Sequence, residues 1–74
     1  MSDGREWGTV KFFNRAKMFG FITPDHGEVE IYLSLYEVEA AELPHDPRQG
    51  DRISYIARRM SKGDAATQVE FEKL

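Results

Sequence analysis

The chain has 74 residues, no cysteine and a formal net charge of −3. That length suits one small domain, which buries only about 60% of the surface that its unfolded chain exposes. Without cysteine, disulfides and thiolate metal sites are excluded, and no apolar run is long enough for a membrane-spanning helix. Residues 1–6 are polar and lack the apolar core of a signal peptide, so we expect a cytoplasmic protein.

The first part of the chain contains three runs that favour β-strands, at residues 7–13, 18–23 and 29–33. Each run is rich in β-branched and aromatic residues, which suit a pleated strand. Pro24, which cannot donate a ladder hydrogen bond, ends the second run, and Gly27 can supply the positive φ that a tight turn often needs. The short connections between the runs indicate an antiparallel meander.

The middle of the chain predicts a short helix. Ser34 and Glu37 have the three-residue spacing of a capping box, with Ser34 as the N-cap. The segment through Leu43 is rich in glutamate and alanine, which are compatible with a helix, and Pro44 ends it. We expect one or two helical turns, followed by a loop over residues 45–51.

Two more strands are predicted after this loop, at residues 52–58 and 66–72, separated by a turn. Five short strands with one short helix predict an all-β fold, either a small closed barrel or a sandwich. A closed barrel would also remove the exposed edges that an open five-stranded sheet leaves. The residues expected to point inward from the last two strands are Ile53, Tyr55, Ala57, Val69 and Phe71.

The charges are unevenly distributed along the chain. Residues 1–22 have four basic and two acidic side chains, residues 23–51 have one and eight, and residues 52–74 have five and three. A net negative charge argues against a polyanionic partner. The two ends are nevertheless basic, so a fold that brings them together would create a basic face.

Aromatic and aliphatic side chains alternate on the second and third predicted strands. Phe19 and Phe21 are two residues apart and share one face, and Tyr32 can lie across from them. The opposite face carries aliphatic side chains, which make the better core. The two rings could instead be the buried face of a strand, as large aromatics usually are. The aliphatic residues on the opposite face are Ile22, Ile31 and Leu33.

An exposed aromatic face on so small a protein indicates a binding site. Single-stranded nucleic acid needs flat rings on which unpaired bases stack and cations near its phosphates, and each stacked base contributes about 1–3 kcal/mol. Lys11 and Lys17 flank the aromatic run in the sequence. This pattern favours binding of single-stranded nucleic acid.

Three motifs resemble those of the cold-shock domain family. They are GTVKFFN at residues 8–14, KMFGFI at 17–22 and IYL at 31–33, in the same order and with similar spacing. The resemblance covers residues 7–74 and implies a five-stranded antiparallel oligonucleotide-binding (OB-fold) barrel with a short helical turn between strands three and four. Residues 1–6 are expected to be a flexible N-terminus. The resemblance also implies binding of single-stranded RNA or DNA, with an RNA-chaperone, gene-regulatory or stress-response role.

The motifs also imply which residues bind the nucleic acid. The stacking rings would be Phe12, Phe19, Phe21 and Tyr32, while Phe13 would be peripheral. Polar and basic side chains would contact the backbone or base edges. These polar and basic residues are Lys11, Asn14 and Lys17. Independently of the motifs, Arg58 is expected to contact phosphates as part of a basic cluster with Arg59 and Lys62, for which a soluble loop is the alternative.

The chain also departs from the family pattern. Phe12 replaces a tryptophan, Met18 a glycine, Ser34 a stacking histidine and Leu35 a phenylalanine, and the loop at 39–50 lacks a further aromatic. Loss of two or three stacking platforms predicts weaker binding or a shorter site. The cap function of Ser34 is an alternative to a role in binding.

Other functions are less well supported by the sequence. No nucleophile–base pair is evident, so we expect no enzymatic activity and no catalytic residues. His26 and His45, without cysteine, make a poor metal site, and no cofactor is expected. An RNA-recognition motif would need two packed helices, for which the chain has no room. We expect a monomer, which is the default for so small a barrel. The remaining alternative function is that of a barrel that has lost nucleic-acid binding and docks a protein partner through the same face.

Overall fold

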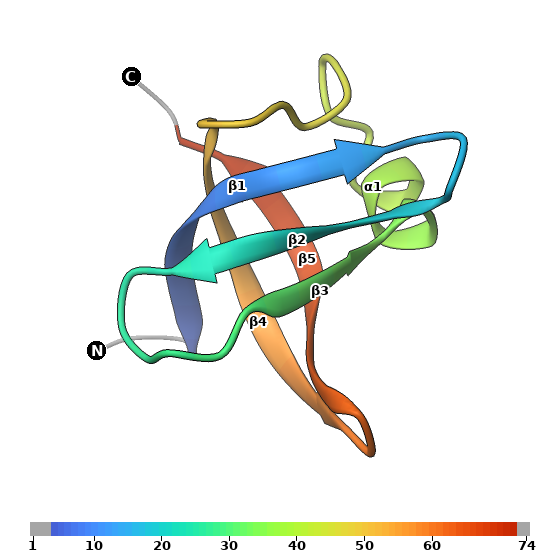
Figure 1. Cartoon of the computed structure of the whole chain (residues 1–74). Coiled ribbons are helices and arrows are strands. Elements are labelled where there is room, and N and C mark those ends of the chain that lie inside the picture. Colours follow the sequence, from blue (N-terminus) through green and yellow to red (C-terminus); the bar gives the residue numbers. More distant parts are fainter. Residues whose placement is uncertain (1–3, 73–74) are drawn as a thin grey trace.

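The structure is a computed structural model that describes residues 4–72 (Figure 1). Five strands and one helix follow each other in the predicted order, although several strands extend beyond the predicted ranges. The predicted flexible N-terminus falls partly on residues 1–3, which lie outside the described residues, and the first strand already includes residues 5 and 6. The elements are β1 (Arg5–Asn14), β2 (Phe19–Pro24), β3 (Ile31–Ser34), α1 (Leu35–Ala41), β4 (Arg52–Met60) and β5 (Gly63–Phe71).

The strands form a closed barrel in the order β1-β2-β3-β5-β4. The predicted all-β barrel with a short helix between the third and fourth strands is confirmed. The prediction of a purely antiparallel barrel is wrong, because β3 and β5 pair in parallel at Tyr32 and Ala65. Strand direction cannot alternate around a closed ring with an odd number of strands, so one neighbouring pair must be parallel.

The interior of the barrel is mainly aliphatic. The predicted inward positions of Ile22, Ile31 and Leu33 are confirmed, since all three are buried. Among the fully buried residues that the structure describes, Tyr55 is the one large aromatic side chain. The described core consists of Val10, Ile22, Ile31, Leu33, Val38, Ile53, Tyr55, Ala66 and Val69, with Phe13, Ala41, Leu43, Ala57 and Phe71 packed against it.

Two irregularities interrupt the alternation of the strands. In β1 the register with β2 shifts between Val10 and Phe12. In the predicted strand at 66–72, regular alternation with Val69 and Phe71 inward would point Ala66 outward, but Ala66 and Val69 are both buried although they are three residues apart. Gln68 between them has a positive φ of 50°, and such a bulge brings both side chains to the same face.

The helix is capped as the sequence predicts. The Ser34 hydroxyl accepts a hydrogen bond from the Glu37 backbone N–H at 3.2 Å. The helix ends at Ala41, because Glu42 takes the left-handed conformation with φ 52° before Pro44 is reached. No helix in residues 4–72 is long and apolar enough to cross a membrane.

The two basic ends of the chain meet in the barrel. β1 pairs with β4 over five residue positions, from Arg5 opposite Ile56 to Thr9 opposite Arg52. β4 in turn pairs with β5. The two basic segments, whose meeting the sequence left as a hypothesis, are therefore adjacent at the level of the strands.

Candidate nucleic-acid interface

Four aromatic rings lie together on the outer surface of β1, β2 and β3, and we call them the aromatic face: Phe12, Phe19, Phe21 and Tyr32. Each of the five ring contacts has centroids 5.8–6.0 Å apart. Most are edge-to-face, whereas Phe19 and Tyr32 are stacked with nearly parallel planes, 14° apart. The sequence prediction grouped these four rings, and the structure brings them into contact.

The β1 irregularity decides which ring of the Phe12–Phe13 pair faces outward. Val10 is buried, so in a regular strand Phe12 would also point inward. The register shift between Val10 and Phe12 reverses the alternation after Val10. As a result Phe12 is 37% exposed, whereas Phe13 packs against the core.

Residues that pair in register form a single row across the barrel. Phe12 pairs with Phe21, and Phe21 pairs with Tyr32. Tyr32 pairs with Ala65 across the parallel junction, and Ala65 pairs with Arg58. Three rings, one alanine and one cation thus form one continuous row over all five strands.

The aromatic face is not part of the core. Tyr32 is 41% exposed, and Phe19 and Phe21 are partly buried by their neighbours in the cluster. None of the four rings belongs to the described core cluster. The interpretation of Phe19 and Phe21 as the buried face of a strand is therefore wrong, because the aliphatic side of β2 and β3 fills the barrel.

Asn14, Phe19 and Ser34 form a second, shorter row. Both polar members already have local partners. The Asn14 side-chain oxygen accepts a hydrogen bond from the Lys17 backbone N–H at 3.1 Å, and the Ser34 hydroxyl caps α1. Asn14 therefore shapes the β1–β2 loop, and only its side-chain amide is left to face a ligand.

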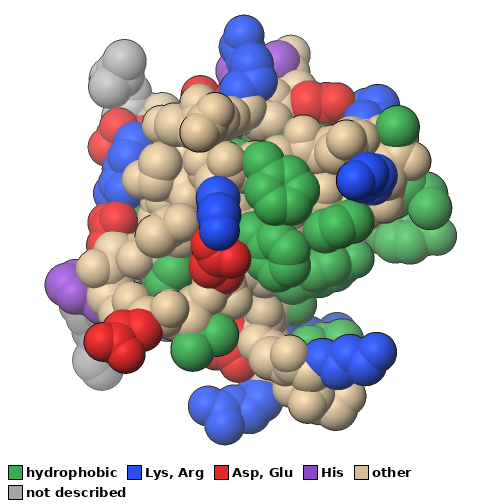
Figure 2. Space-filling model, in the orientation of Figure 1, with side chains coloured by type: hydrophobic (Ala, Val, Ile, Leu, Met, Phe, Trp, Pro, Cys, Tyr) green, Lys and Arg blue, Asp and Glu red, His purple; other side chains and the backbone are tan. Residues whose placement is uncertain are grey.

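The predicted cations differ in their surroundings. Lys11 forms an ion pair with Glu30, with 2.6 Å between Nζ and Oε2. Lys17 and Arg58 form no ion pair with any residue that the structure describes. Figure 2, in the orientation of Figure 1, shows apolar side chains gathered over β1–β3, with basic side chains beside them and on the β4–β5 hairpin.

A cleft of about 480 Å³ adjoins the aromatic face. Phe21 and Tyr32 line one side, and the β4–β5 hairpin, with Met60 and Lys62, lines the other. The sequence suggested Lys62 only as part of a basic cluster and did not suggest Met60. Their position depends on the parallel β3–β5 pairing, for which the local sequence has no signal.

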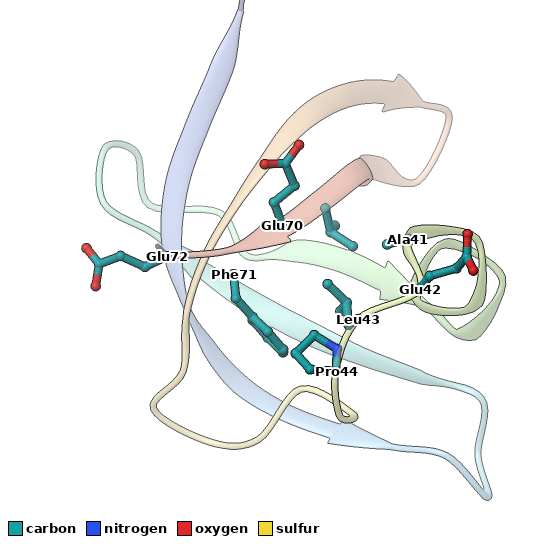
Figure 3. A pocket seen from close by; sticks show the side chains of 8 residues that line it. Ala41, Glu42, Leu43, Pro44, Glu70, Phe71 and Glu72 are labelled. Carbon is teal, nitrogen blue, oxygen red and sulfur yellow. The ribbon is translucent and has the colours of Figure 1, made fainter. Parts of the chain in front are cut away.

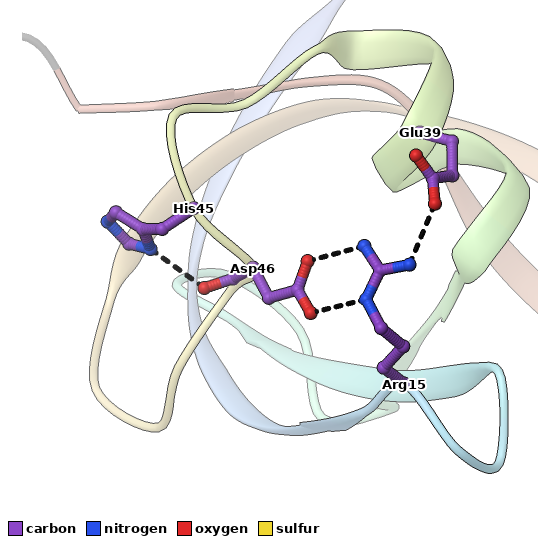
Figure 4. A network of polar contacts seen from close by, with 4 residues as sticks. All are labelled: Arg15, Glu39, His45 and Asp46. Atoms are coloured by element: carbon purple, nitrogen blue, oxygen red, sulfur yellow. Dashed lines mark hydrogen bonds and ion pairs between the residues drawn. The ribbon is translucent and has the colours of Figure 1, made fainter.

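Arg15, in the same loop as Lys17, is bound by two carboxylates (Figure 4). Its guanidinium donates two hydrogen bonds to Asp46, both at 2.7 Å, and one to Glu39 at 2.8 Å. The Arg15 hydrogen bonds hold the pKa of Asp46 below its ordinary value. This network joins the β1–β2 loop to α1 and the α1–β4 loop and neutralises one cation beside the aromatic face.

The two histidines do not meet. The His45 ring stacks on Phe71, with centroids 4.7 Å apart, and His26 lies in the β2–β3 connection. Residues 4–72 contain no group of three or more histidine and carboxylate side chains placed to hold a metal ion.

Comparison with known proteins supplies the family. The family model described as the 'Cold-shock' DNA-binding domain matches residues 6–71. Cold shock protein CapB of Pseudomonas syringae pv. tomato is 36% identical over 66 residues, which cover 89% of this chain and 93% of the relative. A cold shock-like protein CspA of Bordetella pertussis is 32% identical over 65 residues, covering 88% and 96%. A probable cold shock protein of Sinorhizobium fredii is 46% identical over 48 residues, covering 65% and 68%.

Proposed function

Since the chain belongs to the cold-shock DNA-binding domain family, we propose that it binds single-stranded nucleic acid by stacking unpaired bases on its aromatic face. The observation that carries this proposal is the contact between Phe12, Phe19, Phe21 and Tyr32 outside the core. Flat rings side by side provide successive platforms for bases, and stacking accepts any base because every base has a π-face.

Two basic side chains without an ion pair among residues 4–72 support the same proposal. Lys17 lies in the β1–β2 loop, two residues before Phe19, and Arg58 lies in register beyond Tyr32. A strand that follows the row from Phe12 would bring its phosphates near Arg58, and a strand that passes over Phe19 would bring them near Lys17. Lys11 contributes less, because Glu30 already neutralises it.

The proposed site is shorter than that of a typical member of the family. Ser34 caps α1, and Leu35 provides no ring beyond Tyr32. With each lost platform costing about 1–3 kcal/mol, we expect weak binding with little sequence preference. Weak, sequence-tolerant binding suits an RNA chaperone or a regulator of gene expression, and both RNA and DNA single strands are expected ligands.

A titration with oligo-dT, followed through the backbone amide signals of the protein, tests the proposal. We expect shifts at Phe19, Phe21 and Tyr32 that saturate in one step. Tyr32→Ala should weaken the affinity about 5- to 150-fold, which corresponds to the loss of one stacked base.

Trp7→Ala is the matched control for this titration. Trp7 and Tyr32 are exposed to similar extents, 38% and 41%, but Trp7 lies on the far part of β1 beside Arg52. Its replacement should leave the affinity unchanged. Equal losses in both variants, or a flat titration up to millimolar strand, would contradict stacking on the aromatic face.

The second candidate function is docking of a protein through the same face. The Lys11–Glu30 ion pair and the acidic net charge favour it, because both reduce the attraction for phosphates. A flat oligo-dT titration together with a Tyr32-dependent interaction with a protein would support this alternative.

A further inference from the structure

A separate groove lies between α1, the α1–β4 loop and the end of β5. It consists of three hollows of about 250, 500 and 400 Å³. The first two share Ala41, Val69 and Glu70, and the last two share Pro44 and Phe71. Because neighbouring hollows have walls in common, they form one elongated depression, which we call the α1–β5 groove.

The floor of the α1–β5 groove is apolar. Figure 3 shows Leu43, Pro44 and Phe71 converging on its centre. Val69 is buried beneath it, whereas Leu43 and Phe71 are only partly buried and pack against the core. Apolar area is therefore still available for a ligand to cover, and covering it is favourable.

The rim of the groove is acidic. Glu42, Glu70 and Glu72 point outward around the apolar centre in Figure 3, and Glu37 lines the hollow beside α1. Of these four, only Glu70 has an ion pair among the described residues, at 3.6 Å from Arg5.

Few cations counter this acidic rim. Among the described residues that line the groove, Arg52 is the one lysine or arginine, and its guanidinium is already bound to Asp25 by two hydrogen bonds of 2.7 Å. The last turn of α1 has no basic side chain to offset the negative end of the helix. The groove therefore presents a negative rim around an apolar floor.

We propose that the α1–β5 groove binds a basic segment of a partner protein that also carries apolar side chains. An extended segment alternates its side chains, so apolar groups can enter the hollows while lysine or arginine side chains reach the glutamates. The acidic rim repels phosphates, so a nucleic acid is the wrong occupant. The elongated shape suits a peptide chain better than a compact small molecule.

This site is independent of the proposed nucleic-acid site. No residue that lines the α1–β5 groove belongs to the aromatic face or to the cleft beside it. Both ligands can therefore be bound together, and the domain then connects a single strand to a basic protein. Failure of the oligo-dT titration would leave this inference intact.

The test uses the full chain and an acetylated heptapeptide that alternates lysine and leucine. We expect amide shifts at Ala41, Val69 and Phe71, and none at Phe19 or Tyr32. A peptide with serine in place of leucine should not bind, because it cannot fill the apolar floor. Prior addition of oligo-dT should not displace the lysine–leucine peptide.

A rim variant and a control variant distinguish binding in the groove from general attraction between the charges of the protein and the peptide. The double variant Glu42→Lys with Glu72→Lys should weaken peptide binding by about fivefold or more, since it reverses two rim charges. Glu28→Lys, in the exposed β2–β3 connection, is the control and should leave the affinity within about twofold after correction for net charge.

Three outcomes would overturn the proposal. Equal weakening per reversed charge by Glu28→Lys and by the double variant would mean that the peptide senses only net charge. Shifts over the aromatic face, or none at all, would place the peptide elsewhere. Groove shifts that depend on protein concentration without peptide would identify a second copy of the chain as the occupant.

Discussion

The backbone of Phe12 lies directly against Gly20 on the neighbouring strand. A Cβ atom added at Gly20 would be 2.2 Å from the Phe12 carbonyl oxygen and 2.7 Å from the Cα atom of Phe13. Both obstacles are backbone atoms, which cannot move without breaking the β1–β2 pairing. The glycine between Phe19 and Phe21 is therefore a requirement of the close approach that brings Phe12 next to these two rings.

Gly20→Ala should accordingly destabilise the barrel and disturb the aromatic face. Forcing a methyl group into this contact should lower the free energy of unfolding by about 1–3 kcal/mol. Urea unfolding followed by far-UV circular dichroism measures the change. A variant as stable as the parent would show that β1 and β2 separate without cost.

Met18→Gly should stabilise the protein. Met18 has a φ of 67° and an exposed side chain, so its left-handed conformation costs strain that glycine avoids. We expect a gain of up to about 1 kcal/mol, seen as a higher urea midpoint. Ala16→Gly, in the same loop without a positive φ, is the control and should give no gain. If both variants destabilise equally, strain at Met18 is not the cause.

Tyr55 should make the stability of the barrel fall at high pH. Burial is the main cause that raises the pKa of Tyr55 to about 12, above the value of about 10 in an unfolded chain. The folded state thus keeps the Tyr55 proton to a higher pH than the unfolded chain does. The contribution of Tyr55 to stability is therefore complete below pH 10 and is lost as the pH rises toward 12. Unfolding in urea at pH 8 and pH 11 measures this loss.

Tyr55→Phe should remove that pH dependence. The Tyr55 hydroxyl is buried without a hydrogen-bond partner among the described residues, so its removal should also be neutral or stabilising at pH 8. An identical loss of stability between pH 8 and pH 11 in both proteins would assign the effect to other groups.

Lys17 and Arg15 should affect nucleic-acid binding differently, although they are two residues apart. Lys17→Ala should weaken oligo-dT binding and reduce the slope of log affinity against log salt by about 0.7, as expected for one lost phosphate contact on a single strand. Arg15→Ala should leave that slope nearly unchanged, because Asp46 and Glu39 already neutralise the guanidinium. Equal changes of slope in both variants would show that the Arg15 network opens to the nucleic acid.

Much of the candidate site follows from local sequence pattern. The alternation in β2 and β3 predicts that Phe19, Phe21 and Tyr32 share the face opposite the aliphatic core, and the structure agrees. The Ser34 cap was equally predictable, because a capping box needs only residues three apart. The sequence could not predict which cations are neutralised by ion pairs, because Glu30 and Asp46 are distant in the sequence from their partners Lys11 and Arg15.

The sequence by itself determined the number and type of the elements and which faces of β2 and β3 point to the core, because these features depend on periodicity and on neighbouring residues. The tertiary structure alone decided three features: the outward turn of Phe12 at the β1 bulge, the parallel contact that brings Arg58 into the aromatic row, and the α1–β5 groove. Each of them arises from contacts between segments far apart in the chain, which a local pattern cannot encode.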